Sequence, residues 1–169
     1  MNISLAFLYL FPIFVVLIIS FIFFSGQIIF TQSINNKSKL LIERSKNDNQ
    51  SYETSFQLGQ MYFQKKNYIQ AIQRFYSSSQ TWNPNDKLGL ACLYNTLGVT
   101  YFTKKEYTLS IYYYKQAIEL FPNYLTALNN LAFLYEEIKQ KNNARELYGK
   151  IWKLDKNNNN ARNKFQTII

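Results

Sequence analysis

A pattern of small and bulky side chains returns along this chain at a fixed interval. Two sets of four residues lie 34 positions apart: Gly98, Tyr101, Ser110 and Tyr114, then Ala132, Tyr135, Ala144 and Tyr148. A third set with the same internal spacing lies upstream: Gly59, Tyr62, Ala71 and Phe75. It is 39 residues from the second set, because five extra residues fall around Asn85–Gly89. A repeat of this length indicates stacked helical hairpins, since one hairpin cannot bury its own apolar face.

The middle repeat explains why each position holds its residue type. Small Gly98, Ser110 and Ala117 suit the places where two antiparallel helices come closest, and Tyr114 fills the space beside them. Pro122 ends the second helix because proline cannot continue the hydrogen-bond ladder. The pattern resembles the tetratricopeptide repeat (TPR), a 34-residue helix–turn–helix unit. The alternative, three unrelated hairpins, requires the shared spacing to arise by chance.

The TPR resemblance implies an α-solenoid of three repeats with a C-terminal capping helix, and the apolar N-terminus described below adds a transmembrane helix, so we expect an all-α fold. We expect an anchor at 1–30, a polar and basic tether at 31–51, a TPR domain at 52–158 and the capping helix at 159–169. Within the TPR domain the repeats occupy 52–85, 91–124 and 125–158. Its helices are expected at 52–65, 68–82, 86–104, 107–121, 124–138 and 141–154. Asp86 is predicted to cap the third of these helices.

Residues 3–24 contain no charged side chain and only two serines. Twenty-two helical residues extend about 33 Å, compared with roughly 30 Å for the hydrocarbon core of a bilayer. Pro12 kinks such a helix without forbidding it, because transmembrane helices tolerate proline. A cleaved signal peptide is the competing interpretation, but the apolar run is too long and no basic segment precedes it. The sequence therefore predicts an uncleaved membrane anchor, continuing as helix to about Ile42.

The formal net charge is +9, and the first charged side chain is Lys37. Positive residues on this side of the anchor predict that the repeats stay on the side of synthesis, by the positive-inside rule. The charge favours an anionic membrane surface or an acidic partner. Nucleic acid is a rival partner, but the lysine pairs Lys65-Lys66 and Lys104-Lys105 are scattered at turns. We therefore expect no nucleic-acid partner.

The chain contains no histidine and one cysteine. This composition excludes histidine acid–base chemistry and the usual Cys/His zinc sites, and Cys92 reads as a small filler residue. The adjacent carboxylates Glu136 and Glu137 face different directions on a helix. We expect no enzymatic activity, no cofactor and no metal.

The TPR resemblance also implies which side chains bind a partner, because the first helix of each repeat lines the concave face in TPR arrays. The residues at these positions are Phe56, Gln60, Phe63, Asn95, Val99, Phe102, Asn129, Asn130 and Phe133, with Gln64, Thr96, Thr103, Glu136 and Glu137 beside them. Phenylalanine packs against a bound polypeptide and asparagine bonds its backbone. Alternatively, any one of these phenylalanines packs inside the solenoid instead.

Some TPR proteins hold acidic chaperone tails with a clamp of lysine, asparagine and arginine. The corresponding positions here carry no cation: Phe56, Gln60, Thr96, Thr126 and Asn130. An acidic chaperone tail is therefore a poor candidate for the partner.

A single anchor followed by three TPRs, in a basic chain rich in Asn, Lys, Ile, Phe and Tyr, resembles one narrower family. This is the small plastid-encoded and cyanobacterial membrane TPR protein implicated in photosystem I assembly. The resemblance implies a thylakoid location in the plastid, repeats on the stromal side and transient contact with photosystem I subunits. Two alternatives stay open. One is a bacterial TPR factor for envelope biogenesis or secretion, with its repeats in the cytoplasm, and the other is a resident structural subunit.

Overall fold

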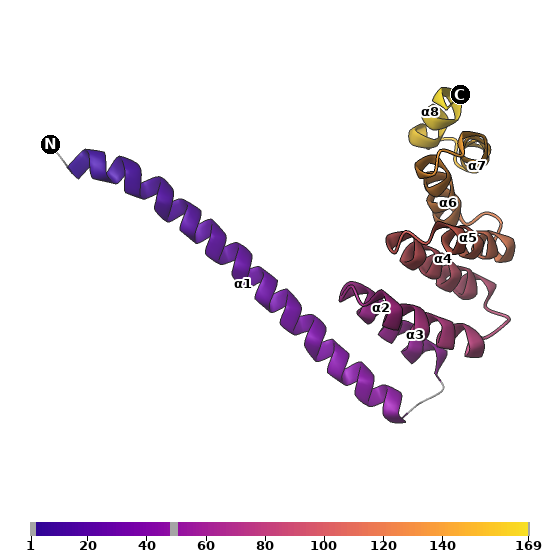
Figure 1. The fold of residues 1–169 in the computed structure, drawn as a ribbon, viewed down its shortest axis with the longest axis horizontal. Coiled ribbons are helices and arrows are strands. Elements are labelled where there is room, and N and C mark those ends of the chain that lie inside the picture. The colour runs from indigo at the N-terminus through magenta and orange to yellow at the C-terminus, as the bar shows by residue number, and fades with distance from the viewer. Residues whose placement is uncertain (1–2, 48–50, 169) are drawn as a thin grey trace. The chain divides into compact units, whose positions relative to one another are not determined.

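The computed structural model describes the backbone of residues 3–47 and 51–168. All regular secondary structure in these residues is helical (Figure 1). The chain forms two compact units, residues 1–44 and 45–169. The first unit consists of most of one long helix, and the second contains the repeats.

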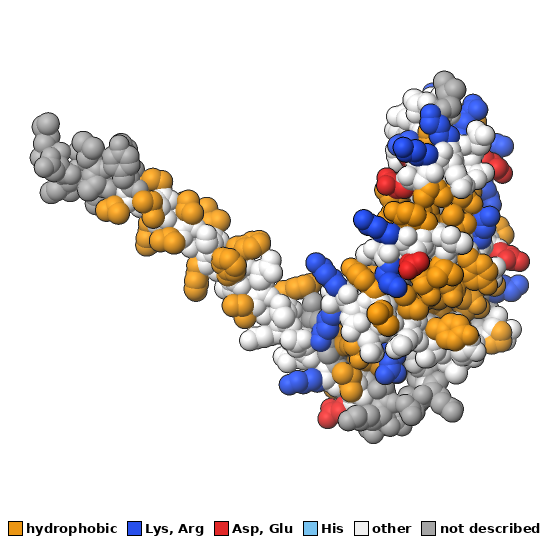
Figure 2. Space-filling model, viewed as in Figure 1, with side chains coloured by type: hydrophobic (Ala, Val, Ile, Leu, Met, Phe, Trp, Pro, Cys, Tyr) orange, Lys and Arg blue, Asp and Glu red, His pale blue; other side chains and the backbone are white. Residues whose placement is uncertain are grey.

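The N-terminal helix, α1 (Ile3–Asn47), includes Pro12 and continues five residues beyond the predicted end near Ile42. Its segment Leu10–Ser33 is long and apolar enough to cross a membrane, judged by length and composition. Hydrophobic side chains cover this segment (Figure 2). The predicted span begins earlier, at residue 3, but the side chains of residues 1–9 lie outside the described set.

The repeats consist of paired helices and a final short helix. Their bounds lie within two residues of the predicted ones: α2 (Tyr52–Gln64), α3 (Tyr68–Thr81), α4 (Lys87–Thr103), α5 (Tyr107–Leu120), α6 (Leu125–Glu137), α7 (Lys141–Leu154) and α8 (Asn159–Thr167). Helices α2 and α3, α4 and α5, and α6 and α7 pack together as the three hairpins. Each hairpin also packs on the next, and α8 packs on α7. The predicted solenoid and capping helix are therefore present.

Helix α4 begins where the sequence predicted it. The side chain of Asp86 accepts a 2.8 Å hydrogen bond from the backbone N–H of Gly89, which is N-cap geometry. Its second carboxylate oxygen accepts a 3.2 Å hydrogen bond from the indole of Trp82. The side chain of Asp86 therefore caps α4 and also bonds Trp82 at the end of α3. These two bonds fix the extra residues between the first two repeats.

Glycines mark the closest approach of the two helices in the first and second hairpins. A Cβ atom added to Gly59 would lie 2.5 Å from the ring of Phe75, and one added to Gly98 would lie 2.5 Å from the ring of Tyr114. Buried Ser110 donates a 2.8 Å hydrogen bond to the carbonyl oxygen of Gly98. The predicted role of these small residues in packing is confirmed.

The apolar core is continuous across the second and third hairpins and α8. Its buried members include Tyr114 from α5, Leu131 from α6, Ile151 from α7 and Ala161 from α8. Phe165 of α8 packs against this cluster and lies so close to α7 that a Cβ on Gly149 would be 2.9 Å from its ring. Helix α8 therefore covers apolar surface that the third hairpin would otherwise expose.

Candidate protein-binding face

The side chains predicted to bind a partner come from the first helices of the three hairpins. We call this set the A-helix face: Phe56, Gln60 and Phe63 on α2, Asn95, Val99 and Phe102 on α4, and Asn129, Asn130 and Phe133 on α6. Helices α4 and α6 contact each other directly. The second and third repeats therefore contribute one shared surface.

An amide pair joins α4 to α6 on this face. The side chain of Asn130 donates a 2.9 Å hydrogen bond to the side-chain oxygen of Asn95. Asn95 is only 7% exposed, whereas Asn130 is half-buried. The bond leaves the side-chain oxygen of Asn130 with acceptor capacity for an incoming donor. Asn129 behaves differently, because its side chain donates a 2.8 Å hydrogen bond to the carbonyl oxygen of Leu125 in its own helix.

An aromatic pair lies on the same two helices. The rings of Phe102 and Phe133 meet edge to face, with their centroids 5.8 Å apart. Phe102 and Val99 are half-buried and pack against the core of the third repeat. Phe133 is 47% exposed, which makes it a large apolar side chain open to solvent. The α4 and α6 part of the face thus combines a free aromatic surface with an amide group.

The phenylalanines of α2 pack mainly within the first repeat. Phe56 contacts the rings of Phe75 and Trp82 at centroid distances of 5.6 and 5.7 Å. Phe63 lies 5.6 Å from the ring of Tyr68. Both are half-buried against a core cluster that α3 and α4 share. These contacts hold them in place, and Gln60 is the exposed member of the face on α2.

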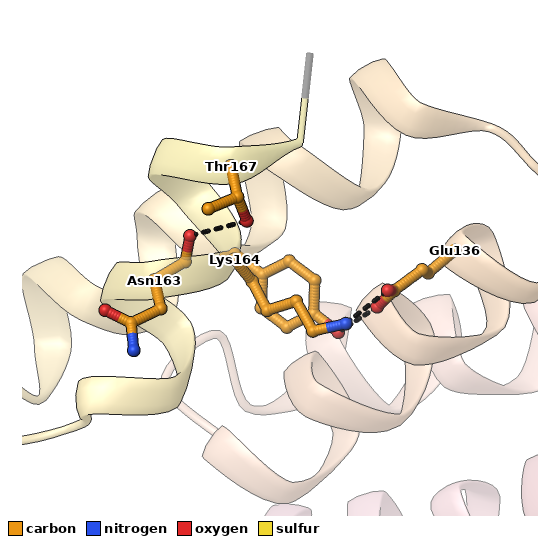
Figure 3. Close-up of polar contacts among 5 residues, drawn as sticks. Glu136, Asn163, Lys164 and Thr167 are labelled. Atoms are coloured by element: carbon orange, nitrogen blue, oxygen red, sulfur yellow. Dashed lines mark hydrogen bonds and ion pairs between the residues drawn. The ribbon is translucent and has the colours of Figure 1, made fainter.

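The carboxylate of Glu136, next to the face on α6, is compensated by two partners. Lys164 of α8 forms an ion pair with one oxygen (Figure 3). Tyr148 of α7 donates a 3.0 Å hydrogen bond to the other oxygen. The hydrogen bond from Lys164 is the main reason that the pKa of Glu136 lies below its ordinary value. Burial and the hydrogen bond to Glu136 raise the pKa of Tyr148. One of the two carboxylates at the predicted acidic end, Glu136, is therefore compensated, whereas within the described residues Glu137 is not.

Sequence reasoning did not foresee the contact between Glu136 and Lys164. One signal was available, because Lys164 lies 34 residues after Asn130 and so takes the equivalent place on α8. A capping helix was predicted, but none of its side chains was assigned to this face.

A second feature missed from the sequence is a hollow of about 410 Å³ between α5, α6 and α7. Charged side chains of both signs line it, among them Lys115 and Glu119 on α5 and Glu146 and Lys150 on α7. Each pair is spaced by four residues, the helical spacing that places opposite charges on one face. This mixed lining gives the hollow no single charge preference.

Among the described residues, no cluster of three or more His, Cys, Asp or Glu side chains that could hold a metal ion occurs. The sulfur of Cys92 lies 3.3 Å from the hydroxyl of Tyr124, so this half-buried thiol has a polar neighbour.

Comparison with known proteins identifies the family. Residues 51–123 and 113–146 match models of the tetratricopeptide repeat. Over 168 residues the chain is 33% identical to ycf37 of Guillardia theta, a match covering 99% of this chain and 94% of that protein. The chain belongs to the ycf37 family of TPR proteins.

Other ycf37 relatives support the assignment. The ycf37 protein of Pyropia yezoensis is 31% identical over 132 residues, covering 76% of this chain and 74% of that one. The chloroplastic TPR domain-containing protein PYG7 of Arabidopsis thaliana is 30% identical over 136 residues. That match covers 80% of this chain but 45% of PYG7. This ancestry is consistent with a TPR scaffold that binds proteins.

Solved structures share the fold of this ycf37-family chain. The crystal structure of MamA has a TM-score of 0.68 at 22% identity, covering 78% of this chain and 74% of MamA. The first TPR of Spaghetti (RPAP3), bound to the HSP90 peptide SRMEEVD, has a TM-score of 0.60 at 20% identity, covering 70% of this chain and 90% of that one. The likeness extends to the fold alone, which is a protein-interaction fold and typically non-catalytic.

Proposed function

We propose that this ycf37-family protein is a membrane-anchored scaffold that holds a segment of a photosystem I subunit or assembly intermediate. The observation that carries the proposal is the shared surface of α4 and α6, where Phe133 is exposed beside the amide pair of Asn95 and Asn130. An exposed apolar ring next to a free amide acceptor suits a polypeptide, which offers both apolar side chains and backbone N–H groups.

The chemistry of this surface favours an apolar or uncharged segment. Between Lys87 at its start and Thr103 at its end, α4 contains no charged residue. On α6, Glu136 is compensated by Lys164, which leaves Glu137 as the other acid of this helix. A strongly charged segment would find few partners here and would lose its hydration. The segment we propose packs an apolar side chain against Phe102 and Phe133 and donates a backbone hydrogen bond to Asn130.

The proposed role of the anchor is to hold the repeats at the membrane. In this proposal the apolar part of α1, Leu10–Ser33, crosses the thylakoid membrane and the repeats lie on the stromal side. Because α1 ends at Asn47 and α2 begins at Tyr52, the link between them is short. Confinement to the membrane raises the effective concentration of the binding face near nascent membrane subunits. A modest affinity of the A-helix face for its partner is then sufficient, and the contact ends when assembly of the complex is complete.

The test is deletion of the gene together with fractionation of solubilised thylakoid membranes. We expect photosystem I levels to fall in the deletion strain, and the protein to migrate with subcomplexes smaller than the mature assembly. Migration with mature photosystem I alone would instead identify a resident structural subunit. Unchanged photosystem I levels under all light regimes would contradict the assembly role.

A further inference from the structure

The turn inside each hairpin has the same unusual backbone conformation. Its central residue lies in the left-handed region, with φ of 59° at Lys66, 63° at Lys105 and 61° at Lys139. The backbone N–H of each of these lysines bonds the carbonyl oxygen three residues earlier, at distances of 2.9, 2.8 and 3.0 Å. The three turns are therefore structurally equivalent, as the repeat spacing requires.

Lysine is a costly choice for this conformation. A side chain with a Cβ atom is strained at positive φ, and glycine is the residue that usually ends a helix there. All three turns place lysine at this position instead. A strained backbone that carries the same side chain three times points to a use for that side chain, here its ammonium group.

Two of these turns lie on the same side of the stack. In Figure 1 the α2–α3 and α4–α5 turns lie on the same side of the repeats, and the α3–α4 and α5–α6 connections lie on the opposite side. We define the turn edge as the lysines of these turns: Lys65, Lys66, Lys104, Lys105 and Lys139. All five are exposed, and none forms an ion pair within the part of the chain that the structure describes. The lysine pairs of the first two hairpins, which appear scattered in the sequence, therefore belong to turns on the same side of the stack (Figure 1).

We propose that the turn edge rests against an anionic lipid surface. Three carboxylates adjoin these five lysines in the sequence, Glu106, Glu136 and Glu137, and Glu136 is already paired with Lys164, so the net charge of the turn edge is positive. Lysine near an anionic leaflet is attracted to it, and the attraction falls off within about 10 Å. This inference rests on the anchoring role proposed for α1. From Ser33 to the start of α2, the chain extends at most about 40 Å, so the tether is short enough to allow the turn edge to reach the lipid.

The composition of the edge favours lipid over nucleic acid. Each of its cations is lysine, and arginine occupies none of these turn positions. Arginine forms the planar, bidentate and stacked contacts typical of nucleic-acid recognition, whereas lysine acts as a flexible point charge. Lipid phosphates form a diffuse layer of negative charge. A side chain that binds this layer needs a positive charge and a flexible stem rather than a fixed hydrogen-bond geometry.

The experiment uses the full chain reconstituted into vesicles of phosphatidylcholine, with or without about 30% phosphatidylglycerol. A fluorophore is attached at Thr103→Cys, beside the edge, or at Thr81→Cys, at the end of α3, in a Cys92→Ser background. Energy transfer to labelled lipid headgroups reports proximity. We expect transfer from position 103 to rise about twofold in anionic vesicles and to reverse in about 0.5 M NaCl. Transfer from position 81 should change little.

Two charge variants give the matched control. Replacing the five turn-edge lysines with glutamine should abolish the response at position 103. Replacing five other lysines with glutamine removes the same charge and should preserve the response: Lys87, Lys115, Lys150, Lys153 and Lys156. An equal loss in both variants would overturn the proposal. The salt dependence of the parent protein tests it even where a variant folds poorly.

The vesicle experiment also distinguishes failure of the turn-edge proposal from failure of the anchor proposal. Full chain that floats with both kinds of vesicle but shows no charge-dependent transfer would overturn the turn edge alone. Failure to float would overturn the anchor and, with it, the turn edge. A larger response at position 103 to single-stranded RNA than to phosphatidylglycerol would overturn the lipid proposal in favour of nucleic acid.

Discussion

The side chain of Asn130 on α6 donates a 2.9 Å hydrogen bond to the side chain of Asn95 on α4. This bond links consecutive repeats through two residues that the sequence had assigned to partner binding. Because Asn95 is nearly buried, its amide oxygen depends on Asn130 for a partner. The predicted binding face and the contact between repeats therefore share the same side chains.

Replacing Asn130 with alanine should destabilise the repeats by about 1–2 kcal/mol, because it leaves a buried acceptor unpaired. The matched control is Asn129→Ala, which loses only a hydrogen bond to its own helix and should cost less than about 1 kcal/mol. Urea unfolding of the full chain in detergent, followed by circular dichroism, measures both. Equal losses of unfolding free energy in the two variants would show that the hydrogen bond between α4 and α6 contributes no more stability than the bond within α6.

Gly98→Ala should destabilise the second repeat by about 1–3 kcal/mol. The added Cβ would lie 2.5 Å from the ring of Tyr114, whose side chain is buried and has little room to move. Gly26→Ala on α1 is the control, because no atom lies within 4 Å of its added Cβ. Helix propensity alone then predicts an unchanged or slightly higher stability for Gly26→Ala. Thermal unfolding distinguishes the two, and an unaffected Gly98→Ala variant would contradict the packing.

Lys105→Gly should raise the stability of the repeats by about 1 kcal/mol, because glycine relieves the strain at φ of 63°. The adjacent Lys104 has φ of −79°, so Lys104→Gly relieves nothing and should lower stability by about 0.5–1 kcal/mol. Both variants remove one positive charge next to the same turn, which isolates the backbone effect. Opposite shifts in the unfolding midpoint are expected. Shifts of the same sign would argue against strain in the turn.

Acidification should weaken the attachment of α8 through Glu136. The pKa of this carboxyl lies below its ordinary value of 4.5, chiefly because of the hydrogen bond from Lys164. A lowered pKa in the folded state stabilises the fold above pH 4.5, and this stabilisation is lost as the pH falls through the folded value. The difference in thermal midpoint between the parent protein and Glu136→Gln should therefore shrink below pH 4.5.

The neighbouring exposed carboxyl provides the control for this titration. Glu137 forms no ion pair within the described part of the chain, so Glu137→Gln should shift the midpoint little at any pH. If Glu136→Gln and Glu137→Gln gave the same pH profile, the contact with Lys164 would contribute nothing measurable.

The repeats were largely predictable because packing fixes their residue types. Glycine at 59 and 98 reflects a contact that admits no Cβ, and Asp86 reflects the need to cap a helix. Because each repeat has the same packing and capping requirements, the same residue types recur at a fixed spacing in the sequence. The same periodicity placed the binding residues on α2, α4 and α6, although which of them bind a partner stays a prediction.

The features that sequence reasoning missed depend on side chains that meet only after the repeats stack. Lys164 contacts Glu136 across 28 residues of sequence, and the repeat spacing gives the position of Lys164 on α8 but not its partner. Likewise, Phe56 is drawn into the first repeat by Phe75 and Trp82, which periodicity alone could not distinguish from exposure to a ligand. The turn lysines appear as separate pairs until the stack aligns their turns.

The most direct test of the binding face is photocrosslinking from position 133 in native thylakoid membranes. Phe133 is exposed on α6, and Tyr112, exposed on α5, provides a control position on the second helix of a repeat. A photoreactive phenylalanine at 133 should capture a photosystem I subunit or assembly intermediate, and one at 112 should not. Capture of the same proteins with equal yield from both positions, or of none from position 133, would contradict binding at the A-helix face.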